Sequence, residues 1–110
     1  MVACVVRMHC SAAWTTWTEV RIDNRRLDLV AESAHGYRIG YEVKSDLVSF
    51  RHEIRNVQKR GPGVLACNEF YFVLPEWYLP EARDVPFDCG LMSCDRDGTL
   101  RIIRPAPQRP

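Results

Sequence analysis

The sequence predicts an α/β (α+β) fold in which one helix crosses over a mixed β-sheet. Two segments, Thr18–Ile22 and Arg25–Glu32, alternate apolar and charged residues as half-buried strands do. Residues 45–60 then place apolar side chains at helical spacing. Phe70–Leu74 is apolar on both faces, which is typical of a central strand. Because a helix connects the strand Tyr37–Lys44 to this central strand, we expect the two strands to be parallel.

Length and composition favour one small domain. A chain of 110 residues allows one modest core, which we expect to span 1–104, with 105–110 as an extended and frayed proline-rich tail. The net charge of +1 means that a nucleic acid would have to be held by a local basic patch. Five cysteines without a CxxC pair argue against a zinc site and fit a reducing cytoplasm. Arg7 interrupts the apolar start, so we expect no export signal and no membrane span.

The first predicted hairpin turns at Asp23-Asn24. With this two-residue turn, the numbers of opposed residues sum to 47, which places Glu19 across from Asp28. Along the second strand, alternation puts one set of residues on the apolar face, namely Leu27, Leu29 and Ala31.

The second predicted hairpin brings two carboxylates together. If its loop has three residues and ends at Gly36 in the left-handed conformation, Ser33 faces Tyr37 and Asp28 lies directly across from Glu42. Opposed Cβ atoms are about 5 Å apart, a distance at which two ionised carboxylates repel. A divalent cation, Mg²⁺ or Mn²⁺, would offset that repulsion. A loop of another length would move the two groups apart, and this alternative stays open.

The predicted helix carries the best basic patch of the chain. Ser45 or Asp46 can cap its start, and it should run to about Arg60, where Gly61-Pro62-Gly63 stops it. Its apolar stripe consists of Leu47, Phe50, Ile54 and Val57. Its basic row consists of Arg51, Arg55 and Lys59, spaced four apart. Such a row is either a solvated face or a phosphate-binding surface.

A last hairpin is predicted between Cys89–Ser93 and Thr99–Arg104, around a turn that ends at Gly98. It follows a proline-rich surface loop over residues 74–86.

Asp28 on one strand, Glu42-Val43-Lys44 on the next and a basic crossover helix together resemble the PD-(D/E)xK nuclease superfamily, whose core is restriction-endonuclease-like. More narrowly, "RRLDLVAE", "GYEVKSD", "CNEFYFVLP", "CGLM" and "LRIIRPAP" are similar to the small MmcB-like branch of bacteria and their phages, which is associated with DNA repair. Two features depart from the pattern. Few residues remain for a first helix with its additional glutamate, and Asn68 stands where such relatives often have aspartate.

The resemblance implies a metal-dependent DNA endonuclease. Asp28 and Glu42 would bind Mg²⁺ or Mn²⁺ with the Val43 carbonyl, and Lys44 would orient or activate the attacking water. Glu19 is either a third carboxylate at the metal or a solvent-facing edge residue. The basic row on the helix would hold DNA, and a homodimer would allow both strands to be cut. The alternative is a nuclease-like module that binds DNA or a protein without cutting, and a third reading is a structural subunit.

Overall fold

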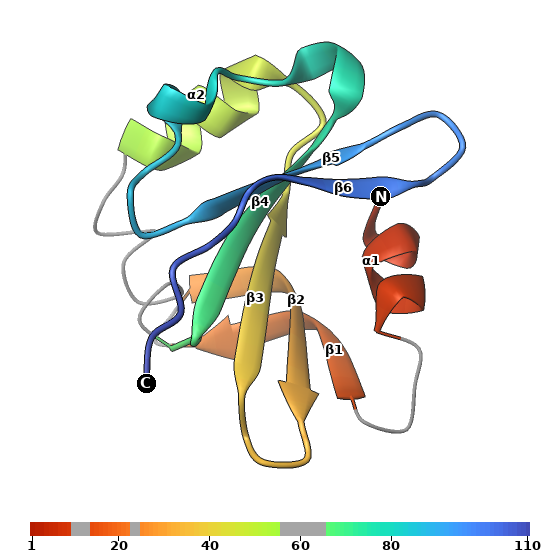
Figure 1. Cartoon of the computed structure of the whole chain (residues 1–110), viewed down its shortest axis with the longest axis vertical. Helices are drawn as coiled ribbons and strands as arrows, with labels where there is room; N and C mark the ends of the chain where they lie inside the picture. Colours follow the sequence, from red (N-terminus) through yellow and green to blue (C-terminus); the bar gives the residue numbers. More distant parts are fainter. Residues whose placement is uncertain (10–13, 23–24, 56–65) are drawn as a thin grey trace.

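A six-stranded mixed β-sheet runs through the molecule, with its strands in the order β1-β2-β3-β4-β5-β6 (Figure 1). This computed structural model describes residues 1–9, 14–22, 25–55 and 66–110. The helices and strands are α1 (Val2–Met8), β1 (Trp14–Ile22), β2 (Arg25–Ser33), β3 (Arg38–Val43), α2 (Leu47–Arg55), β4 (Glu69–Pro75), the 3₁₀ turns η1 (Glu76–Tyr78) and η2 (Ala82–Asp84), β5 (Gly90–Cys94) and β6 (Leu100–Arg104). The predicted mixed α+β architecture is therefore confirmed.

The middle of the sheet is parallel and its two ends are antiparallel. β3 pairs with β4 and β4 with β5 in parallel, whereas β1–β2, β2–β3 and β5–β6 are antiparallel pairs. The predicted parallel arrangement of β3 and β4 and the predicted last hairpin are thus confirmed. Because β3, β4 and β5 run in one direction, their carboxyl ends meet at the same edge of the sheet.

Both predicted registers are confirmed. Val20 pairs with Leu27 across β1–β2, so these opposed numbers sum to 47, although the turn itself at 23–24 lies outside the described residues. Leu29 pairs with Tyr41 across β2–β3, which gives the predicted sum of 70. The β2–β3 turn contains Gly36 at φ +83°, the left-handed conformation that a three-residue hairpin loop needs.

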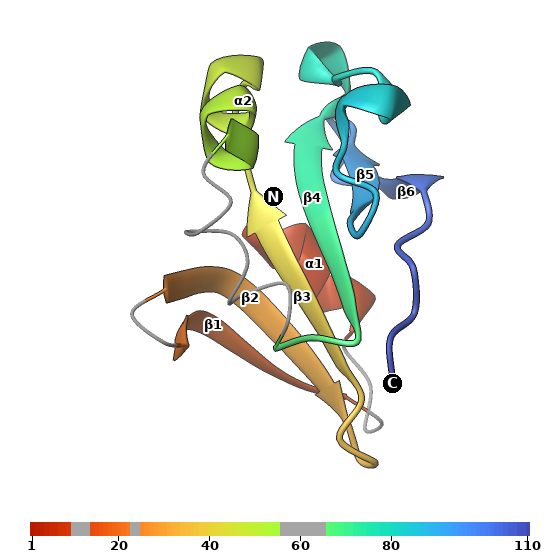
Figure 2. The same ribbon diagram turned by 90° about the vertical axis from the view of Figure 1, so that its left-hand side faces the viewer.

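One face assignment was wrong. Leu29 and Ala31 share one face of the sheet, as predicted, but Leu27 belongs to the cluster on the opposite face. The β1–β2 ladder skips Glu19, which has a φ of +54°, so the regular alternation is broken at this point. Figure 2 shows the strong bend of the β1–β2 ribbon.

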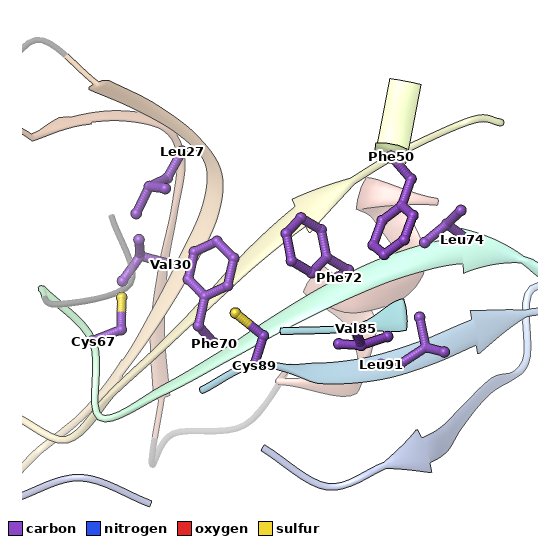
Figure 3. Packing of buried hydrophobic residues seen from close by; sticks show 10 residues of the cluster. All are labelled: Leu27, Val30, Phe50, Cys67, Phe70, Phe72, Leu74, Val85, Cys89 and Leu91. Atoms are coloured by element: carbon purple, nitrogen blue, oxygen red, sulfur yellow. The ribbon is translucent and has the colours of Figure 1, made fainter. Parts of the chain in front are cut away.

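Each face of the sheet carries its own hydrophobic cluster. The cluster beneath α2 contains buried residues that Figure 3 shows as sticks: Leu27, Val30, Phe50, Cys67, Phe70, Phe72, Leu74, Val85, Cys89 and Leu91. Phe50 of α2 meets Phe72 of β4 edge to face, with ring centroids 5.1 Å apart. On the other face, Val5 of α1 is fully buried among β-strand residues. The two helices therefore cover opposite faces, and the centre of the sheet is buried on both sides, as predicted for β4.

The crossover helix begins as the sequence predicts. Asp46 caps it, because its Oδ1 accepts a hydrogen bond from the Ser49 N–H at 2.7 Å. That hydrogen bond holds the pKa of the Asp46 carboxyl below its usual range. The structure describes α2 as far as Arg55, so the predicted helix end at residues 60–63 lies outside the described residues.

The proline-rich tail over residues 105–110 contains no helix or strand, and it is not frayed, contrary to the prediction. Ala106 is buried, and the Arg109 N–H donates to the Asn68 carbonyl at 2.8 Å. The Asn68 side chain donates back to the Arg109 carbonyl at 2.7 Å, and the Arg109 guanidinium donates to the Cys67 carbonyl at 2.7 Å. These long-range hydrogen bonds fasten the tail beside the start of β4. The proline content of the tail alone does not indicate this attachment.

Buried and partly buried polar groups form hydrogen bonds on the α1 face. His9 and the Tyr41 hydroxyl form a buried hydrogen bond of 2.5 Å, and burial lowers the pKa of His9. Tyr37 donates to Glu69 at 2.7 Å, and burial together with this carboxylate raises the pKa of Tyr37 to about 12. These groups fix α1 and the start of β4 to the sheet.

Candidate active site at the carboxyl end of β3

Glu42 and Lys44 lie together where β3 ends. Glu42 is buried and its neighbours Tyr41 and Val43 pack on the α1 face, so the Glu42 side chain points to the α2 face. The Lys44 N–H donates to the Val73 carbonyl at 2.9 Å, which continues the parallel ladder one step beyond β3. The ladder thus holds Glu42 and Lys44 on the same side of the chain, toward the crossover helix.

Asp28 is tied directly to this strand end. The last backbone-paired residues of β2 and β3 are Leu29 and Tyr41, and at the next step the Val43 N–H donates to the Asp28 carboxylate at 2.7 Å. The Asp28 side chain therefore reaches the peptide group that joins Glu42 to Val43. The predicted proximity of Asp28 to the Glu42-Val43-Lys44 segment follows from the register and is present in the structure.

The Lys44 ammonium lies between two carboxylates. Its Nζ is 3.0 Å from Glu53 Oε1 and 3.6 Å from Glu42 Oε2. The side chains of Lys44, Glu42 and Glu53 are only 18%, 5% and 2% exposed, respectively. Charges with so little access to water interact more strongly than surface charges do. The ammonium is consequently fixed from β3 on one side and from α2 on the other.

Glu53 is the residue that sequence reasoning missed. It lies on α2, three positions after Phe50 and directly before Ile54, which means that it falls within the apolar stripe of the helix. An acidic residue inside such a stripe must find a buried partner, because an unpaired buried charge is very costly. That signal was present in the sequence, but the identity of the partner depends on how the helix packs on the sheet.

Glu19 does not join the acidic residues of this site. Its side chain is 72% exposed and lies 3.8 Å from the Arg26 guanidinium. Within residues 1–9, 14–22, 25–55 and 66–110, no group of three or more His, Cys, Asp and Glu side chains is arranged to hold a metal ion. Of the two roles considered for Glu19, the structure places it as a solvent-facing edge residue. The first helix is short, as expected. Its seven residues include no acidic side chain that could take the place of the additional glutamate of the nuclease pattern.

Two members of the predicted basic row lie on the exposed surface of α2. Arg51 and Arg55 are exposed and one helical turn apart, whereas Lys59 lies outside the described residues. Arg51 is two positions from the buried Glu53, so the two side chains leave different faces of α2. The structure thus brings Asp28, Glu42, Lys44 and the new Glu53 together, with two arginines on the adjoining helix.

Within the described part of the chain, no helix has the length and apolar character needed to cross a lipid bilayer.

Comparison with known proteins shows a similar fold among the solved structures. No protein-family model matches the chain, and no curated protein matches it. Among solved structures, the chain is similar to the SPO1766 protein of unknown function from Silicibacter pomeroyi, with a TM-score of 0.72 and 22% sequence identity over 99% of this chain and 71% of that one. A Pyrococcus furiosus SfsA structure in complex with Ca²⁺ aligns with a TM-score of 0.45 and 12% identity, over 99% of this chain and 61% of that one. The chain therefore shares the fold of the SPO1766 protein.

Proposed function

We propose that the chain is a divalent-metal-dependent DNA endonuclease with a restriction-endonuclease-like core of the PD-(D/E)xK type. The observation that carries this proposal is the contact between the Asp28 carboxylate and the Val43 N–H, beside Glu42 and Lys44. An aspartate and an ExK segment from different strands are thereby joined by a hydrogen bond at the carboxyl end of β3. Repair or recombination of DNA, or phage DNA metabolism, is the setting that the resemblance suggests.

The residues at this strand end fit Mg²⁺ or Mn²⁺. Asp28 and Glu42 offer carboxylate oxygens and Val43 a backbone carbonyl, and all three are hard donors. Mg²⁺ commonly keeps several waters and takes only one or two protein carboxylates, so a third acidic ligand such as Glu19 is not required. A bound ion would neutralise charge on the scissile phosphate and make a water molecule more acidic.

Lys44 is the group that we assign to the phosphate itself. Water attacks phosphorus, the bond from phosphorus to the leaving oxygen breaks, and that oxygen takes up a proton as the phosphate monoester forms. Negative charge builds up on the phosphate oxygens during this step, and a fixed ammonium stabilises it. Glu53 acts as a positioning residue, because its carboxylate holds the Lys44 Nζ at 3.0 Å.

Arg51 and Arg55, with Lys59, would hold the DNA backbone. Contacts to phosphate give affinity that is independent of sequence and sensitive to salt, with the logarithm of the binding constant falling by about 0.9 per phosphate contact for each unit of log salt. An Arg51→Gln/Arg55→Gln variant should reduce that slope by about 2 in fluorescence-anisotropy titrations with duplex DNA. Arg101→Gln is the control, because Arg101 is exposed on β6, away from the helix.

Cleavage assays test the proposal. The protein is incubated with duplex, single-stranded, flap and four-way-junction DNA in Mg²⁺ or Mn²⁺. We expect cleavage of at least one substrate, and a loss of at least about 100-fold in Asp28→Asn, Glu42→Gln and Lys44→Met. Glu19→Gln, which changes an exposed carboxylate, is the matched control and should cut normally. Equal activity in all folded variants would refute the assignment.

One observation favours a second candidate, a nuclease-like module that binds DNA or a protein without cutting. The Lys44 ammonium already contacts the carboxylates of Glu42 and Glu53, so each of these groups has a charged partner within the chain without an added ion. In that case Mn²⁺ should leave the melting temperature unchanged. A metal site would stabilise the native state, by about 2.7 kcal/mol at a hundred times the Kd, and Glu42→Gln should abolish that gain.

A further inference from the structure

Two cysteines from distant parts of the chain meet on the α1 face, away from the candidate active site. Cys4 lies in α1 and Cys94 is the last residue of β5, 90 positions later, yet their Sγ atoms are 3.9 Å apart. A disulfide requires sulfurs at about 2.0 Å, so the two atoms must approach by roughly 2 Å, which is within the range of side-chain rotation. Both thiols are reduced in the structure.

The two thiols have different surroundings. Cys4 is partly exposed, and the Arg7 guanidinium donates a hydrogen bond to its Sγ at 3.3 Å. Cys94 is only 4% exposed, and burial, followed by the contact with Cys4, raises its pKa. An outer thiol in contact with a guanidinium thus lies beside an inner thiol that solvent scarcely reaches. This is the arrangement of an attacking cysteine with its resolving partner.

The β5–β6 turn closes over the pair. A Cβ atom at Gly98 would lie 3.0 Å from Cys4 Sγ and 3.1 Å from the Arg7 guanidinium, and Gly98 itself has a φ of +82°. A side chain at this position would press on both Cys4 and Arg7. The turn therefore keeps Cys4 close to the end of β5.

We propose that Cys4 and Cys94 form a reversible disulfide that fastens α1 to the β5–β6 hairpin when the protein meets a hydroperoxide. The Cys4 thiolate attacks one peroxide oxygen, the O–O bond breaks, and with hydrogen peroxide the released hydroxide takes a proton to become water, which leaves Cys4 as a sulfenic acid. The Cys94 sulfur then attacks the Cys4 sulfur, the S–O bond breaks and a second water leaves. Two thiols are oxidised to one disulfide while one peroxide is reduced to two waters.

The remaining cysteines differ from this pair and provide controls. Cys67 and Cys89 are buried in the cluster on the α2 face, and burial raises the pKa of Cys67 to about 11. Buried thiols of this kind react slowly with oxidants. Cys10 lies outside the described residues, so it is the competitor that the experiment must exclude.

The test uses the full chain, reduced and then treated with an equimolar amount of hydrogen peroxide. We expect a mass loss of about 2 Da, a proteolytic fragment that joins the peptides of Cys4 and Cys94, and reversal by dithiothreitol. Because the cross-link closes a loop of 90 positions, the melting temperature should rise by about 10–20 °C on oxidation. Cys4→Ser and Cys94→Ser should lose all three effects, whereas Cys10→Ser should keep them.

Even if a variant fails to fold, peptide mapping of the oxidised wild type shows whether Cys4 and Cys94 are joined by a disulfide. A disulfide that joins Cys10 to either residue would overturn the proposal. So would stable addition of oxygen to Cys4 without a cross-link, or a native fold that resists equimolar peroxide and shows no change in mass.

Discussion

The ion pair between Lys44 and Glu53 should make a large and strongly coupled contribution to stability. At an effective dielectric constant of about 20, charges at 3.0 Å and 3.6 Å attract by about 5.5 and about 4.6 kcal/mol, respectively, which offsets the cost of removing the groups from water. Lys44→Met removes both attractions and leaves two buried carboxylates. We expect a loss of about 3 kcal/mol in the free energy of unfolding, the lower end of the usual range, because Lys44 retains 18% exposure.

The double variant Lys44→Met/Glu53→Leu isolates the cost of leaving the Glu53 carboxylate buried without its ammonium partner. It also removes the buried Glu53 charge, so it should recover at least about 1.5 kcal/mol relative to Lys44→Met. Urea denaturation at pH 7 of the wild type, both single variants and the double variant completes the thermodynamic cycle. If the changes in the free energy of unfolding are additive, or if the double variant is no more stable than Lys44→Met, the predicted coupling between Lys44 and Glu53 is refuted.

The matched control is the ion pair between Arg83 and Glu81. Its N–O distance of 2.7 Å is shorter than the 3.0 Å between Lys44 and Glu53, but its side chains are 81% and 67% exposed. The same cycle with Arg83→Met and Glu81→Leu should give a coupling below about 0.5 kcal/mol. This comparison separates the effect of burial from the effect of distance.

Two further perturbations probe the α1 face and the tail. Because burial lowers the pKa of His9 from 6.5, the unfolded state binds a proton first, and stability should fall as pH drops below 6.5, by at most about 1.4 kcal/mol per pH unit until the folded pKa is reached. Urea denaturation between pH 5 and 8 should show this slope, which His9→Gln removes and which His52→Gln, at an exposed position, retains. Gly90→Ala should cost about 2–3 kcal/mol, since its Cβ would lie 2.4 Å from the Tyr71 ring and 2.7 Å from the Ala106 nitrogen. A Gly90→Ala protein with unchanged melting temperature and unchanged amide exchange in the tail would contradict this packing.

Features that depend on short-range geometry could be predicted from the sequence. A turn of known length and one left-handed glycine determine a register, so the opposition of β2 and β3 followed from Gly36 by counting. Asp46 was one of two candidate caps, and the hydrogen bond to Ser49 selects it. The parallel pairing of β3 with β4 followed from the connecting helix alone.

Features that depend on contacts between distant segments could not be predicted. The partner of Glu53 is set by the packing of α2 on the sheet, and the tail is fastened by Asn68, 41 positions from Arg109. Leu27 lies on the opposite face from Leu29, beside the point where Glu19 on β1 adopts a left-handed conformation that glutamate rarely favours. Whether the site binds a metal and cuts DNA stays a prediction.

The hairpin geometry also limits how the gene can change in length. Because β-strand side chains alternate, one codon added to or lost from the β2–β3 turn would slide Asp28 past its partner and turn it away from Val43. The β2–β3 turn should therefore keep a constant length during divergence.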